Sequence, residues 1–139
     1  EGDFADVPEI AAARERVLIV NEVMFDYRGT IEVYDTLWPE AVPRFLSLNG
    51  QREPIVRLRP GEVQRWRIVQ AAHESNFRLA LDNHLLHPIA YDGISRARIE
   101  AQQNIVVAPG QRIDILVQAG EPGLDLAPHA RHPDQSGQR

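Results

Sequence analysis

The chain has 139 residues, no cysteine and a formal net charge of −5. This is the length of a single domain, and a hydrophobic fraction of 43% is ordinary for a globular protein. The acidic balance argues against nucleic acid as a partner, and the absence of cysteine excludes disulfides, zinc–thiolate sites and thiol catalysis. No apolar run reaches the roughly 18 residues that cross a bilayer, so we expect no membrane span.

The first part of the chain predicts a peripheral segment followed by a core strand. Asp6 and Glu9 have capping-box spacing before a short helical turn at residues 10–13. Residues 16–23 are nearly all apolar, which predicts a strand buried on both faces. Residues 24–43 mix aromatic side chains with turn formers, which indicates a long connection with one short strand at residues 31–34.

From Phe45 onward, short alternating segments are separated by turn residues. Asn49-Gly50 predicts a tight turn, and Trp66 and Ile68 should face the core while Arg65 and Arg67 face away from it. The strands expected here are 45–48, 55–59, 63–71, 77–81, 85–91, 104–107 and 112–119. Seven or eight such strands predict an all-β sandwich or barrel.

The pattern divides the chain into an N-terminal segment at 1–15, a domain at 16–126 and a tail or linker at 127–139. Because the chain opens at Glu1 rather than Met, we expect it to be an excised or processed piece.

The order of four motifs carries a family resemblance. They are the Asn49-Gly50 turn, the Pro60-Gly61-Glu62 turn with the Arg-Trp-Arg-Ile strand after it, the Asp92-Gly93 turn, and the Pro-Gly-Gln-Arg-Ile-Asp run at 109–114. The chain resembles the middle plastocyanin-like (cupredoxin) domain of a laccase-like multicopper oxidase. It departs from that pattern at Gln70-Ala71, where Asn-Ala is usual, and at Asn83-His84, where Gly-His is usual.

The resemblance implies a Greek-key fold of cupredoxin type and an architectural role. Oxidases of this family join three cupredoxin domains, and the outer two supply the copper ligands. By resemblance the parent enzyme oxidises phenols, amines or low-valent metal ions, reduces dioxygen to water, contains copper, and is periplasmic or secreted. This chain would hold no copper and have no activity alone. Its partners would be the flanking cupredoxin domains, with no nucleic acid and no membrane.

Several residues are candidates for contact or chemistry. His84 and His87 form a weak candidate metal pair, since a strand would direct them to opposite faces and a stable site needs three or four converging ligands. Contact with a neighbouring domain is predicted for Tyr27, Tyr34, Trp38 and His84. A triad built on His73 and Ser75 is disfavoured, because triad members normally come from distant segments.

Two interpretations from other classes stay open. One is a free-standing β-sandwich module that binds a protein or another ligand and has no enzymatic role. The other is an independent metalloprotein that uses histidines alone.

Overall fold

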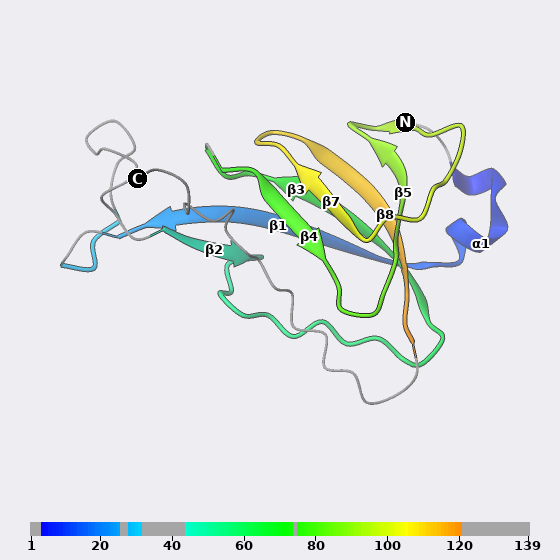
Figure 1. Cartoon of the computed structure of the whole chain (residues 1–139), viewed down its shortest axis with the longest axis horizontal. Coiled ribbons are helices and arrows are strands. Elements are labelled where there is room, and N and C mark those ends of the chain that lie inside the picture. The colour runs from blue at the N-terminus through cyan, green and yellow to red at the C-terminus, as the bar shows by residue number, and fades with distance from the viewer. Residues whose placement is uncertain (1–3, 26–27, 32–43, 74, 121–139) are drawn as a thin grey trace, which may run out of the picture.

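The computed structural model describes residues 4–25, 28–31, 44–73 and 75–120, and within these ranges eight strands form two sheets (Figure 1). The large sheet has the order β2-β1-β3-β8-β5-β6, and the small sheet pairs β4 with β7. The strands are β1 (Arg14–Met24), β2 (Arg44–Leu48), β3 (Val63–Gln70), β4 (Phe77–Ala80), β5 (Leu86–Tyr91), β6 (Ile94–Ser95), β7 (Asn104–Val107) and β8 (Arg112–Gln118).

The two sheets make an open sandwich. β1 runs parallel to β3, and the remaining strand pairs are antiparallel. Among the residues that the structure describes, β2 and β6 form the edges of the large sheet, so the sheet does not close on itself. The all-β sandwich predicted from the alternation is therefore confirmed, and the closed barrel that the sequence left open is not the form adopted.

The core lies between the sheets, where one face of each strand is buried. In β3 the buried residues alternate with half-buried ones, so Trp66 and Ile68 face inward as predicted. The small sheet contributes Phe77, Leu79, Ile105 and Val107 to the same core. The small sheet crosses one face of the large sheet in Figure 1, which places its apolar side chains against β3 and β8.

β1 differs from the sequence-based prediction. Its burial alternates, with Leu18 and Val20 inside the sandwich, whereas Val17 is 50% and Ile19 44% exposed. The prediction of a strand buried on both faces is therefore wrong for this chain. The apolar run placed suitable side chains on both faces, but only one of them lies against the small sheet.

Residues 55–59 were predicted as a strand, and they form none. Val56 and Leu58 still pack against the core, while Ile55 is 79% exposed. The carbonyl of Arg57 accepts hydrogen bonds from the Arg16 and Gln64 side chains instead of from a neighbouring strand. Apolar alternation was therefore a correct indicator of burial here but not of ladder pairing.

The predicted turns lie where the sequence placed them. Asn49 and Gly50 have φ values of 52° and 77°, and Asp92 and Gly93 have 49° and 84°. Positive φ at both central residues is what a tight hairpin turn requires, and Asn, Asp and Gly tolerate it best.

The N-terminal segment contains a short 3-10 turn, η1 (Phe4–Asp6), and one helical turn, α1 (Pro8–Ala11). The predicted capping box does not form, since the N-cap is Val7 and no side chain caps the helix. Ile31 makes an isolated bridge to Phe25, and residues 32–34 of the predicted strand lie outside the described residues. No helix in the described ranges is long and apolar enough to span a membrane.

Candidate functional site

His84 lies in the turn between β4 and β5, where both of its ring nitrogens have partners. Nδ1 is 2.7 Å from the carbonyl oxygen of Asp82, and Nε2 accepts the backbone N–H of Gly120 at 3.1 Å. Because Nε2 accepts the Gly120 N–H, Nδ1 is the ring nitrogen placed to donate to the Asp82 carbonyl. His84 therefore ties the β4–β5 turn to the chain just after β8.

His87 is a strand residue on the opposite side of the large sheet from the core. It is the register partner of Leu116, whereas its neighbour Leu86 is fully buried opposite Val117. His84 itself precedes the strand, which begins at Leu86 rather than at the predicted Leu85.

The donor set in the described residues does not fit a copper centre of the family's kind. The chain has no cysteine to supply a thiolate, and His84 already uses both ring nitrogens. No group of three or more His, Cys, Asp or Glu side chains is close enough to hold a metal ion in the part of the chain that the structure describes.

The predicted interdomain residues Tyr27, Tyr34 and Trp38 lie outside the described residues, so their contact with a neighbouring domain stays a prediction. Ser75, once considered for a triad, donates its hydroxyl to Glu22 Oε1 at 2.9 Å. Glu22 is 4% exposed and sits on β1, so this contact links the β3–β4 connection to the large sheet.

A charged cluster occupies the outer face of the large sheet. Asp114 pairs with Arg65 and lies 3.5 Å from Arg67 Nε, and Glu15 is 3.7 Å from Arg65 and 3.5 Å from Arg67. Asp114 on β8 therefore faces two arginines on the neighbouring strand β3. Two cations and two anions balance one another, so these arginines do not form a site for an acidic ligand.

Gln64 organises a polar cluster inside the sandwich that sequence reasoning missed. Its side chain is fully buried. Its oxygen accepts from Arg16 Nε at 2.6 Å and Trp66 Nε1 at 3.1 Å, and its nitrogen donates to Glu62 Oε1 at 2.8 Å and to the Arg57 carbonyl at 3.3 Å. The sequence did contain a sign that Gln64 is buried. In the alternating pattern of β3, Gln64 lies on the same face as Trp66 and Ile68.

Glu62 closes the Pro60-Gly61-Glu62 turn. Its carboxylate accepts the backbone N–H of Arg59 at 2.6 Å and the amide of Gln64 at 2.8 Å. The pKa of the Glu62 carboxyl is lowered, because both donors favour its ionised form. The larger effect comes from the backbone N–H of Arg59 and the smaller one from the side-chain amide of Gln64. These two hydrogen bonds explain in structural terms why a glutamate suits the third position of this turn.

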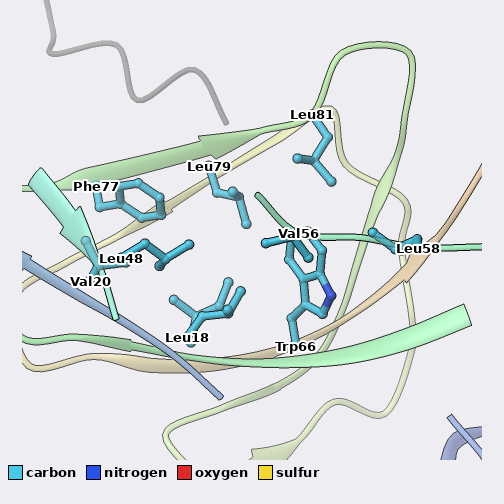
Figure 2. A pocket seen from close by; sticks show the side chains of 10 residues that line it. Leu18, Val20, Leu48, Val56, Leu58, Trp66, Phe77, Leu79 and Leu81 are labelled. Atoms are coloured by element: carbon cyan, nitrogen blue, oxygen red, sulfur yellow. The ribbon is translucent and has the colours of Figure 1, made fainter. Parts of the chain in front are cut away.

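An apolar pocket of about 30 Å³ opens into the core between β1, β3 and β4 (Figure 2). In Figure 2, Leu18 and Trp66 rise from the large sheet toward Leu79 and Leu81, and Val56 and Leu58 flank them from the connection before β3. It is lined by Leu18, Val20, Leu48, Val56, Leu58, Trp66, Ile68, Phe77, Leu79 and Leu81. Its described lining is aliphatic and aromatic, and the indole N–H of Trp66 is already bonded to Gln64, which is the character of core packing rather than of a catalytic site.

Comparison with known proteins shows the family to which this sandwich belongs. The family model described as multicopper oxidase matches residues 15–125. The chain belongs to the multicopper oxidase family. No curated protein sequence matches it.

Solved multicopper oxidases share the fold. A variant of McoA from the hyperthermophile Aquifex aeolicus is 25% identical with a TM-score of 0.68, over 85% of this chain and 28% of that one. The oxidase from Pseudomonas thermotolerans is 23% identical with a TM-score of 0.69, over 80% and 28%. A laccase-like oxidase from the lignin-degrading Ochrobactrum sp. is 25% identical with a TM-score of 0.61, over 76% and 24%. This chain therefore spans about a quarter of the length of these relatives.

Proposed function

We propose that this chain is the copper-free middle cupredoxin domain of a multicopper oxidase, and that it spaces two copper-bearing domains. The observation that carries the proposal is the family match over residues 15–125 in a chain without cysteine. A blue copper site needs a cysteine thiolate, so a domain that lacks one cannot carry that centre.

The geometry of the histidines supports the same role. Both ring nitrogens of His84 are used within the fold, and His87 sits in β5 opposite Leu116. Copper sites depend on ligands fixed in three dimensions, so a rigid sandwich between two such sites has a function even without binding metal. The parent would oxidise phenols, amines or metal ions and reduce dioxygen, in a periplasmic or secreted location.

Copper titration of the 139-residue chain tests the proposal. We expect no tight stoichiometric Cu(II) binding by absorption or EPR, because the described residues offer no converging donor set. A bound copper ion that is lost in both His84→Ala and His87→Ala would instead identify a metalloprotein.

The gene on either side gives a second test, since His-x-His motifs upstream and a His-Cys-His motif downstream are expected. Stop codons at both ends would favour a free-standing binding module.

A further inference from the structure

The outer face of the large sheet carries an uncovered group of aliphatic side chains. Val17 is 50% exposed and Ile19 is 44% exposed. Ile19 is the register partner of Val69 on β3, so these three side chains, which we call the β1 patch, are neighbours on one face. A strand that is apolar on both faces is typical of a sheet that is covered on both faces.

Part of this outer face is already covered. The guanidinium carbon of Arg65 lies 5.0 Å from the ring centre of Phe4, so the N-terminal segment packs over β3. Farther across the sheet, Ala90 is the register partner of Asp114 and is 4% exposed. The β1 patch lies beside this covered region, and a partner placed there would continue the cover toward the edge of the sheet.

The backbone of β1 is not available for an added strand at this point. β2 pairs only with residues from Val20 onward. Before that, Asn49 Oδ1 accepts the N–H of Ile19 at 2.8 Å, and Asn49 Nδ2 donates to the carbonyl of Val17 at 3.0 Å. The backbone N–H of Asn49 also donates to the carbonyl of Ile19 at 2.8 Å. Contact at the β1 patch must therefore be made through side chains.

The size of the patch decides between kinds of partner. Two half-exposed aliphatic side chains offer on the order of 100 Å² of apolar surface. A separate protein or a second copy needs about 800 Å² on each side for a stable complex, whereas a covalently tethered domain is present at an effective concentration of about 1 mM. The charges beside the patch do not call for an acidic or basic partner, because Arg67 is paired with both Glu15 and Asp114.

We propose that the β1 patch docks onto an apolar surface of a flanking domain in the same polypeptide. This rests on the proposed spacer function and adds Val17, Ile19 and Val69 to the contact residues predicted from the sequence, which were Tyr27, Tyr34, Trp38 and His84. The contact fixes the outer face of β1 against the neighbouring domain and so contributes to the angle between domains.

Thiol accessibility tests this docking, because the chain has no cysteine of its own. Ile19→Cys and Val17→Cys are compared with Ile55→Cys, whose native side chain is 79% exposed and lies in the connection between β2 and β3. Each is alkylated both in the 139-residue chain and in the full-length parent, and the modified peptide is quantified by mass spectrometry. We expect alkylation at positions 19 and 17 to slow by about tenfold or more in the parent, because burial protects a thiol, while Ile55→Cys reacts equally in both.

The outcomes separate the two proposals. A parent with flanking cupredoxin domains in which the thiols at positions 17 and 19 react as fast as in the 139-residue chain overturns the docking and leaves the spacer function intact. A gene without flanking domains overturns both. Concentration-dependent protection of the isolated chain, with dimers in sedimentation, would assign the patch to a second copy and overturn the tethered partner.

Discussion

Gln64 illustrates how one residue organises the interior of the sandwich. A buried side-chain amide satisfies four groups at once, among them the indole N–H of Trp66 and the carbonyl of Arg57. Buried polar groups without partners cost about 1–3 kcal/mol each, so the amide stabilises the fold mainly by leaving none unpaired.

Replacing this amide should therefore be costly. Gln64→Leu keeps the volume and removes every hydrogen bond, so we expect the free energy of unfolding to fall by about 2–3 kcal/mol in urea denaturation. Gln118→Leu is the matched control, since Gln118 is exposed at the end of β8, and it should change stability by less than about 0.5 kcal/mol. Equal effects of the two substitutions would show that the Gln64 cluster contributes little.

Glu62 should make the stability of the fold depend on pH. Its pKa is lowered in the folded chain by the N–H of Arg59 and the amide of Gln64, so its contribution to stability is present above the unfolded pKa. That contribution is lost as the pH falls through the lowered folded pKa. We expect Glu62→Gln to unfold at a lower temperature than the native chain near neutral pH, and the difference to shrink below about pH 4. A difference in melting temperature that is constant from neutral to acidic pH would contradict this assignment.

At the scale of the element, the β2–β3 connection shows what local sequence can specify. Asn49 was predicted only as a turn former, and its positive φ confirms that role. Its second role, in which the side chain pairs with the backbone of β1, depends on a strand 30 residues earlier in the chain. No local pattern reports such a contact.

The two roles of Asn49 can be separated by substitution. Asn49→Gly keeps the positive φ and loses the side-chain bonds to Ile19 and Val17, so we expect a loss of about 1 kcal/mol in unfolding free energy. Asn49→Ala loses these bonds and adds about 1 kcal/mol of backbone strain in the left-handed region. Urea denaturation should therefore rank the native chain, the glycine variant and the alanine variant in decreasing stability. Equal stability of the two variants would show that alanine at position 49 causes no measurable backbone strain.

The sequence predicted most of the strands and turns of this chain. It failed where contacts between distant segments determine burial or strand pairing. The alternation of Trp66 and Ile68 with Arg65 and Arg67 placed β3 correctly. Val17 and Ile19 were assigned to the interior because hydrophobicity reports suitability for burial and does not report whether a partner is present. The segment around Val56 packs inward without pairing to a strand, and the carbonyl of Arg57 bonds to the Arg16 and Gln64 side chains, whose positions periodicity cannot locate.

For the whole molecule, the candidate site was less predictable than the fold. The turn motifs pointed to the family, and the match over residues 15–125 established it. The partners of the His84 ring come from Asp82 and from Gly120, and only the second is distant in sequence. Sequence therefore identified the histidine, while its link to the end of β8 required the three-dimensional arrangement.

The sandwich as a whole should unfold as one unit, because the small sheet consists of β4 and β7 in the part of the chain that the structure describes. A two-stranded sheet is marginal alone, so these strands depend on the core they share with β3 and β8. Leu79 is 5% exposed at the centre of that contact, and Leu79→Ala should lower the unfolding free energy by about 2–4 kcal/mol. In this variant, amide hydrogen exchange read by NMR should report the same decrease for the protected amides of β4 and of β3. Faster exchange confined to β4 and β7 would show that the small sheet opens independently, and a spacer built that way could not hold a fixed angle between domains.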